Sequence, residues 1–480
     1  MKDKLKECVD WLRGKGVNYA DCRYVRTEKE SLNVSDGNVD SFVRNLDVGV
    51  GIRVVANGAW GFASTATLTG AELRKTANLA LKIAKASAIT KHESVVLAEQ
   101  EPYVARYRTK FKVDPFTVSS DDKIGLLINV CDEIRKSKKI KTAEGSMEFH
   151  HINKLFVSTE GAEIEQEIRE AGGGYAAVAF DGNEAHRRSY PNSFGGDYAT
   201  SGYEFIDSMN FMDHTDRVRE EAVALLKAAP CPDTTTTVII NGPQMALQVH
   251  ESCGHPTELD RVLGTEISLA GGSFMTIDKL KKLKYGSDIV NIVADATVPG
   301  ALGSFGYDDE GVKAARNWLI RKGKFVGYLS SRETAPVINQ RSSGTMRADG
   351  WNRLPLIRMT NINLEPGSWE LDDLIADTKN GVFFDINKSW SIDDKRLNFQ
   401  FGGECAWEIK NGKLGRMFKN PTYTGITPEF WNSCDAICNK NHWHVWGLPN
   451  CGKGEPMQSA HVAHGAAPAR FRNVKVGVSK

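Results

Sequence analysis

Helical and strand-like hydrophobic patterns alternate along the N-terminal part of the chain. Apolar residues recur at helical spacing over 2–15, which predicts an amphipathic helix. Period-two alternation over 48–55 and 59–64 predicts two strands, and Asn57-Gly58 between them is a strong signal for a hairpin turn. A capping box that begins at Thr69 predicts a second helix. These elements indicate a β-rich sheet flanked by helices.

A second set of patterns begins after a weakly patterned stretch that ends near Pro115. A helical pattern over 120–136 precedes a long alternating region over 142–180, which predicts a β-meander. A further helix is predicted over 215–227. The segment 229–232, with two prolines, follows it and marks a boundary.

These boundaries predict three domains. They are an N-terminal α/β domain over 1–105, a central α+β domain over 110–228 and a C-terminal domain over 233–480. The C-terminal domain is expected to be largely β, with one helix that carries a histidine motif. The predicted fold class is α+β, with mixed or antiparallel sheets and flanking helices. A length of 480 residues is ample for several domains with a large core.

Composition and charge narrow the class of protein. The 61 basic and 60 acidic residues give a net charge of +1, which argues against a dedicated nucleic-acid-binding surface. No stretch approaches the ~20 apolar residues of a membrane span, and the charged N-terminus lacks the apolar segment of a signal peptide. The nine cysteines do not form the dense framework of a small secreted scaffold. We therefore expect a cytoplasmic protein with reduced thiols.

The most informative motif in the C-terminal domain is His250-Glu251-Ser252-Cys253-Gly254-His255. Two imidazoles around one carboxylate are the set that a hydrolytic zinc site uses. On an ideal helix, a spacing of five turns the second ring about 140° from the first, whereas a spacing of four leaves about 40°. Gly254 and Pro256 are expected to end or distort the helix, so that His255 can swing back towards His250. Two unrelated histidines on a surface helix are an equal alternative on this pattern alone.

A catalytic zinc site needs about three protein ligands and an open position, so a further ligand must lie elsewhere. The candidates are Cys405, Cys434, Cys438, His442, His444, Cys451, His461 and His464. Cys434 and Cys438 lie one turn apart on a predicted helix and suggest a buried face. His442 and His444 alternate as in a half-buried strand. Cys451 stands in a glycine-rich loop near Lys453, a setting that favours a thiolate, and is one candidate among several.

Several stretches of the chain form a recognisable set. They are Gly49-Val50-Gly51-Ile52-Arg53, the motif from His250 to His255 with Glu258 and Asp260, Asp308-Asp309-Glu310-Gly311, Cys451-Gly452-Lys453-Gly454, His464-Gly465 and Ala469-Arg470-Phe471. Together they resemble the TldD/PmbA family (also called TldD/TldE) of bacterial and archaeal metalloproteases, over nearly the full length. The family also contains paralogous subunits that lack the histidine motif. Since this chain keeps the motif, it resembles the active, TldD-type members.

The resemblance implies a specific site. Its zinc ligands would be His250, His255 and Cys451, and Glu251 would act as general base towards a metal-activated water. One thiolate reduces the 2+ charge of zinc to a net +1, as one carboxylate does in His₂-carboxylate metallopeptidases, so the ion can still polarise a carbonyl. Glu258 and Asp260 lie just after His255 in the sequence. On the sequence alone, plain solvation at the helix end is an equal alternative, and the resemblance favours acceptance of an N–H from a ligating histidine, as carboxylates around metal sites commonly do.

Two other clusters have structural interpretations. Asp308-Asp309-Glu310 lacks the spacing of a known calcium loop, and a local capping role or a position behind the metal ligands is favoured. Gly172-Gly173-Gly174 has no phosphate-binding pattern. A strand bend or a close backbone approach is expected there and at Gly402-Gly403.

The expected function is a zinc-dependent peptidase that cleaves short or unfolded peptides. The alternative is a zinc-holding peptide-binding or chaperone-like subunit with little turnover, which a fourth protein ligand such as His461 or His464 would favour. A non-peptide amide hydrolase is a third possibility. The resemblance implies a homodimer, or a heterodimer with an inactive paralogue, and the N-terminal sheet, not obviously covered by its own helices, is the expected contact. No nucleic-acid or membrane partner is expected.

Overall fold

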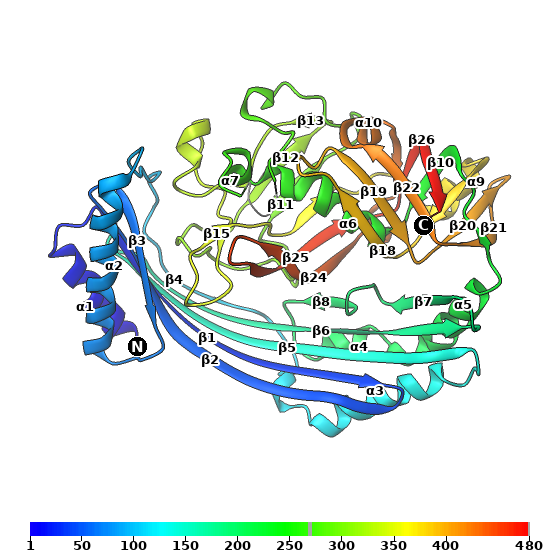
Figure 1. The fold of residues 1–480 in the computed structure, drawn as a ribbon, viewed down its shortest axis with the longest axis horizontal. Helices are drawn as coiled ribbons and strands as arrows, with labels where there is room; N and C mark the ends of the chain where they lie inside the picture. The colour runs from blue at the N-terminus through cyan, green and yellow to red at the C-terminus, as the bar shows by residue number, and fades with distance from the viewer. Residues whose placement is uncertain (267–270, 479–480) are drawn as a thin grey trace.

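The computed structural model of the protein describes residues 1–266 and 271–478. Residues 479 and 480, which end the third expected domain, lie outside the described residues. The molecule has two layers, a long curved sheet from the N-terminal half and a C-terminal domain that lies over its inner face (Figure 1).

Four long strands form the body of the eight-stranded sheet. They are β1 (Tyr19–Ser35), β2 (Asn38–Ala56), β5 (Ile140–Ser158) and β6 (Glu163–Phe180). The order is β3-β2-β1-β5-β6-β4, and the shorter strands are β3 (Ala59–Thr65), β4 (Val104–Arg108), β7 (Ala185–Tyr190) and β8 (Asp197–Ala199). β1 pairs antiparallel with β5 along almost its whole length. One continuous sheet therefore joins the segments that the sequence patterns assign to separate N-terminal and central domains.

Helices pack against this sheet at its two ends (Figure 1). They are α1 (Lys2–Arg13) and α2 (Gly70–Thr90) at one end, and α3 (Ser120–Ile134), α4 (Glu204–Ser208) and α5 (Thr215–Leu225) at the other. Each group has its own hydrophobic cluster with the strands beneath it. The N-cap half of the predicted capping box is present, because the Thr69 hydroxyl accepts the Glu72 N–H at 3.3 Å, while the Glu72 carboxylate pairs with Lys75. None of the described helices is long and apolar enough to cross a membrane.

The C-terminal domain is built around a mixed ten-stranded sheet. Its strands are β9 (Ala229–Pro230), β10 (Thr234–Ile240), β17 (Asn380–Phe384), β18 (Asn387–Ile392), β19 (Asn398–Gly403), β20 (Cys405–Lys410), β21 (Lys413–Lys419), β22 (Pro421–Ile426), β23 (Cys434–Ile437) and β26 (Ala469–Val478). β10 and β17 run parallel, and most of the other pairs are antiparallel. The predicted α+β class with mixed and antiparallel sheets is confirmed.

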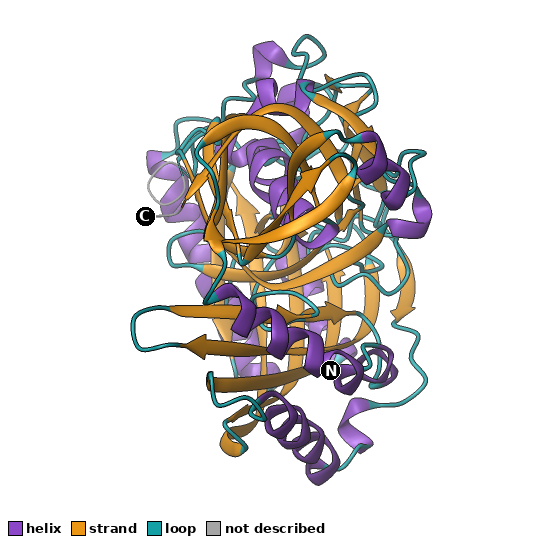
Figure 2. Cartoon of the chain, turned by 90° about the vertical axis from the view of Figure 1, so that its right-hand side faces the viewer, coloured by secondary structure: helices purple, strands orange, loops and turns teal. Residues whose placement is uncertain are grey.

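Smaller sheets and short helices complete this domain. One sheet contains β11 (Ile292–Asp295), β12 (Arg316–Arg321), β13 (Lys324–Phe325) and β16 (Ile362–Leu364), and two hairpins are formed by β14 (Met346–Arg347) with β15 (Leu356–Ile357) and by β24 (His444–Lys453) with β25 (Gln458–Ala466). The α-helices are α6 (Gly242–Val249), α7 (Leu259–Val262), α9 (Leu371–Asp377) and α10 (Thr427–Asn432). Figure 2 shows curved strands around the helices of this domain. Among these helices, α6 is almost wholly buried.

Two local predictions in this domain are wrong. Helix α10 ends before Cys434, which begins β23 and pairs with β26. Strand pairing with a distant segment thus overrides the local helical pattern, although Cys434 and Cys438 are buried as expected. His442 ends a 3-10 turn that the Asn439 side chain caps, and β24 begins only at His444.

The three glycines Gly172-Gly173-Gly174 lie within β6, as predicted for a close backbone approach. A Cβ at Gly172 would lie 1.9 Å from the Tyr198 ring, and one at Gly174 would lie 2.5 Å from the Gly196 Cα. The absence of side chains at these glycines lets β8, which pairs antiparallel with β6, and the residues before it approach β6 closely. At Gly402 the nearest obstacle is the Ser389 hydroxyl, 2.7 Å away.

The acidic cluster Asp308-Asp309-Glu310 joins the two layers. The Asp308 carboxylate accepts the N–H groups of Glu310 and Val312 at 2.9 Å each, so the predicted capping role is confirmed. Asp309 accepts from Lys154 of β5 at 3.1 Å, and Glu310 pairs with Arg53 of β2 at 3.5 Å. The cluster therefore contacts the long sheet and not the histidine motif.

Arg188 of β7 makes a second connection between the layers. Its guanidinium is fully buried and lies 2.8 Å from Glu221, 2.7 Å from Asp385 and 3.2 Å from Glu404. Burial raises the pKa of Glu404, and the Arg188 charge opposes this rise. One buried guanidinium thus contacts three carboxylates.

Replacing Arg188 with methionine is expected to lower the free energy of unfolding by about 3–5 kcal/mol at neutral pH, because the carboxylates stay buried without their partner. The pKa of Glu404 in the fold then rises further above its unfolded value, so stability is lost as pH rises. Urea unfolding should therefore show a larger loss at about pH 8 than at about pH 5. The exposed neighbour Arg187 provides the control, and equal losses at both pH values would contradict the electrostatic explanation.

Candidate metal centre

The histidine motif forms a π-helical turn. α6 ends at Val249, residues His250–Gly254 form the π turn, and His255–Thr257 form a 3-10 turn. The His255 N–H donates to the His250 carbonyl, an i→i+5 bond that widens the turn. Residues five apart therefore lie on one side, with ring centroids 4.8 Å apart and planes at 84°. The expected distortion occurs, but it is a π turn that ends at Gly254 rather than a simple helix end.

Neighbouring side chains fix this turn. A Cβ at Gly254 would lie 2.1 Å from the Met359 sulfur, so a larger residue there would force the buried Met359 side chain to move. The Ser252 hydroxyl accepts from the Trp431 indole N–H at 2.9 Å, and the Tyr285 hydroxyl donates to the Ser252 carbonyl at 2.9 Å. Ser252 and Gly254 thus hold the backbone of the turn rather than extend the site.

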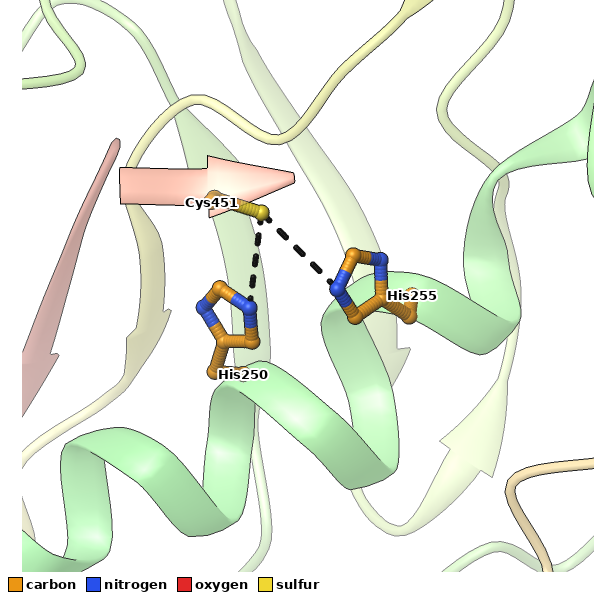
Figure 3. A group of neighbouring side chains, drawn as sticks. All are labelled: His250, His255 and Cys451. Carbon is orange, nitrogen blue, oxygen red and sulfur yellow. Dashed lines mark hydrogen bonds between the residues drawn. The ribbon is translucent and has the colours of Figure 1, made fainter. Parts of the chain in front are cut away.

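Cys451 lies opposite the two histidines, and all three side chains point towards one another (Figure 3). Its Sγ is 3.5 Å from Nε2 of His250 and 3.8 Å from Nε2 of His255. All three residues are buried. Cys451 belongs to β24 and not to a loop as predicted, although the pairing of β24 with β25 is irregular just before it.

The spacing of these atoms suits a zinc ion. With Zn–S near 2.3 Å and Zn–N near 2.0–2.1 Å, tetrahedral geometry separates sulfur from nitrogen by about 3.6 Å. The observed distances of 3.5 and 3.8 Å bracket that value. Two imidazoles and a thiolate are also donors that zinc prefers. The residues present therefore fit the ion in donor type and in spacing.

The outer nitrogens of both histidines have partners. Nδ1 of His250 is 2.7 Å from Nε2 of His464, whose own Nδ1 is 3.2 Å from the Ile362 carbonyl. Because that carbonyl can only accept, we assign Nδ1–H to His464 and Nδ1–H to His250. Nδ1 of His255 is 3.0 Å from the Glu258 carboxylate and donates to it. Both Nε2 lone pairs therefore face Cys451, as metal ligation requires.

Local charges favour the ligand forms of these groups. Burial lowers the pKa of His250 and of His255, which keeps both rings neutral. Burial alone would raise the pKa of Cys451, but its interactions with the His255 ring and the Arg358 guanidinium lower that pKa. Lys453 does not supply such an interaction, contrary to prediction. Its ammonium pairs with Asp260 at 2.7 Å and donates to a backbone carbonyl.

The two carboxylates after the motif have different positions. Glu258 accepts from His255, as expected, and lies 3.3 Å from Arg261 and 3.5 Å from Lys453. Burial would raise the pKa of Glu258, but Lys453 and His255 lower it well below its usual value. Asp260 contacts Lys453 instead of a motif histidine, so its predicted contact is not formed.

Glu251 has a partner that the sequence did not indicate. Its Oε2 accepts from Nη1 of Arg396 at 2.7 Å, and both side chains are largely buried. Arg396 lies in the turn between β18 and β19, where its φ is +63°. It follows the motif by 145 residues, and no local pattern distinguishes it from an ordinary turn residue.

Among the other candidate ligands, His464 contacts the outer nitrogen of His250, and the rest lie away from the three converging side chains. The remaining thiols are Cys405, Cys434 and Cys438, and burial raises the pKa of each. The remaining histidines pair with carboxylates, His442 with Glu370, His444 with Asp197 and His461 with Glu170. Three ligands thus converge on one point.

Three models of one protein family match the chain in order. They describe domain 1, the central domain and the C-terminal domain of the PmbA/TldA metallopeptidases, and they match residues 20–84, 113–227 and 233–478. The chain belongs to the PmbA/TldD family. The family predicted from the sequence is therefore confirmed.

Curated relatives of this family member are named metalloproteases. One from Methanocaldococcus jannaschii is 30% identical over 92% of this chain and 94% of its own length. A zinc metalloprotease TldD homolog from Saccharolobus solfataricus is 22% identical, over 96% of this chain and 97% of its own. The crystal structure of TldE from Thermococcus kodakarensis shares the fold, with a TM-score of 0.73 at 17% identity, over 99% of this chain and 100% of that one.

Proposed function

We propose that the protein is a zinc-dependent peptidase that cleaves short or unfolded peptides. The observation that carries the proposal is the convergence of His250, His255 and Cys451, whose ligand atoms lie within 4.8 Å of one another. Three protein ligands leave one position of a tetrahedral ion open, as in catalytic zinc sites. His464 binds the outer face of His250 and so does not complete the ligand set. The names of the relatives support the same activity.

The residues around the site would divide the chemistry between them. Zinc, when bound, supplies a Lewis acid that polarises the scissile carbonyl and activates water. Glu251 would take a proton from the attacking water and pass it to the leaving amine, so that water adds as the C–N bond breaks. Arg396 would hold Oε2 of Glu251 and orient the carboxylate.

A cavity near the site has a size that suits an extended peptide, and its lining does not include His250, Glu251, His255 or Cys451. It encloses about 650 Å³ between the long sheet and the β24–β25 hairpin, and Asn450 and Ala460 next to Cys451 line it. Its wall carries both basic and acidic groups, including Lys154, Arg347 and Glu170. A volume in the ~300–1,000 Å³ range admits a small ligand or a few residues and not a folded domain.

The test is metal content and cleavage on one purified sample. We expect zinc to co-purify, cleavage of unfolded peptides to disappear on chelation, and activity to return when zinc is restored. A folded globular protein should resist cleavage and serves as the negative substrate. Cleavage that survives complete removal of metal would overturn the proposal.

The Glu251–Arg396 pair favours one alternative, a zinc-holding peptide-binding subunit with little turnover. An Oε2 atom that stays hydrogen-bonded to Arg396 is not free to take a proton from water. Under this alternative the metal-loaded protein would bind peptides but leave them intact. The same sample distinguishes the two functions, because peptide binding and cleavage can be measured in parallel.

We further propose that the protein forms a dimer through the long sheet. The outer part of β2 exposes Val39, Phe42, Val43 and Leu46. β3 pairs only with residues 50–56 of β2, so among the described strands the edge before residue 50 has no neighbour on that side. Free edges pair readily with another chain. The partner could be a second copy of this chain or a TldE-like paralogue. TldE from Thermococcus kodakarensis has the same fold as this chain.

Light scattering at micromolar concentration should therefore show a dimer. Replacing Phe42 with lysine should shift it towards monomer, because the change places charge in the exposed apolar edge. Leu414, an exposed residue of the C-terminal domain, is the control position. A monomeric unmodified chain that also fails to bind a paralogue would contradict this proposal.

A further inference from the structure

A second cluster of ligating side chains lies on the other face of the β24–β25 hairpin. Cys451 pairs with Ala460, so Ala460 and His464 share the face that meets the histidine motif. His461 lies between them in the sequence and points to the opposite face, towards the long sheet. There it meets His150 of β5, with ring centroids 4.9 Å apart and planes at 85°.

The cluster consists of Glu148, His150 and His461, whose ligand atoms lie within 4.8 Å of one another. Nε2 of His150 is 2.7 Å from Oε1 of Glu148. Glu148 and His150 are two apart on β5 and share its inner face. Both histidines and Glu148 line the 650 Å³ cavity, so solvent can reach the group.

A further carboxylate orients His461. Oε2 of Glu170, on β6, is 2.6 Å from Nδ1 of His461, which directs Nε2 away from that carboxylate. This carboxylate–histidine arrangement is the one that supports metal-ligating imidazoles. Oε1 of Glu148 is the oxygen that faces His150. Lys29 contacts the other carboxylate oxygen, Oε2, at 2.7 Å.

We propose that Glu148, His150 and His461 form a second site for a divalent transition-metal ion such as Zn²⁺ or Co²⁺. Two imidazoles and one carboxylate are ligands that these ions accept, without the thiolate of the first site. The ion replaces the proton between Glu148 and His150, and solvent from the cavity completes its coordination. Since the ligands come from β5 and β25, the ion links the long sheet to the C-terminal domain.

Cobalt titration of the metal-free full chain tests this site. Thiolate ligation to Co²⁺ gives a charge-transfer absorption that nitrogen and oxygen ligands do not give. We expect this absorption to saturate at about one equivalent, while a second equivalent binds without increasing it and raises the melting temperature. Zinc content after dialysis against zinc should correspondingly be about two ions per chain.

Single-residue variants test whether the second equivalent of metal binds to the cluster of Glu148, His150 and His461. Glu148→Gln and His150→Asn should each bind about one ion, with the thiolate absorption unchanged, which also shows that each variant is folded. His151→Asn is the matched control, because His151 is the next residue on β5 and contacts Asn153 and Glu167 instead. It should bind both ions. Saturation of the unmodified chain at one equivalent, or binding of two ions by both variants, would overturn the proposal. Loss of the thiolate absorption alone would instead count against the first site.

Discussion

Replacing Cys451 with alanine is expected to remove the ion bound by His250 and His255. Loss of a carboxylate that only orients a ligating histidine typically costs 10–100-fold in metal affinity, and loss of a direct ligand should cost more. The two remaining imidazoles provide incomplete coordination. Elemental analysis should therefore show one ion fewer per chain than in the unmodified protein, and peptide cleavage should disappear with it.

Cys434→Ala is the matched control for this prediction. Cys434 is also buried, but burial raises its pKa and its sulfur lies near the Ala436 carbonyl, away from the histidines. The control should keep its metal and its thiolate absorption with cobalt. Full occupancy in Cys451→Ala together with loss in Cys434→Ala would refute the ligand assignment.

The sequence patterns located most of the local structure in the N-terminal half. The hairpin at Asn57-Gly58 and the helix that begins after Thr69 depend on neighbouring residues only, and both are present. The pairing of β1 with β5 could not be predicted in this way. It joins residues more than a hundred positions apart, and its register depends on the packing of both faces.

The ligand set was predicted because a family resemblance supplied Cys451, and the structure places it opposite both histidines. The sequence patterns could not predict the π turn, because helical periodicity assumes i→i+4 bonding. The patterns also did not indicate that Arg396 contacts Glu251 or that His464 contacts the outer nitrogen of His250. His464 was considered as a fourth ligand, and only its distance of 2.7 Å from the outer nitrogen of His250 excludes that position.

Replacing Glu251 with glutamine should separate catalysis from metal binding. The carboxylate accepts from Arg396 and is no part of the ligand set, so the ion should stay bound. Loss of a general base should lower kcat by at least ~10², with little change in KM, because the variant still binds the peptide. Metal content and kcat must be measured on the same preparation.

Glu258→Gln is the informative comparison, because it alters the other glutamate of the same segment. Glu258 accepts from His255, so its change should weaken metal affinity by about 10–100-fold and leave activity recoverable in excess zinc. Glu251→Gln should remain inactive at any zinc concentration. Unchanged cleavage in Glu251→Gln with zinc in place would refute the base assignment. The base would then lie elsewhere, and the ion pair between Glu251 and Arg396 would have a structural role.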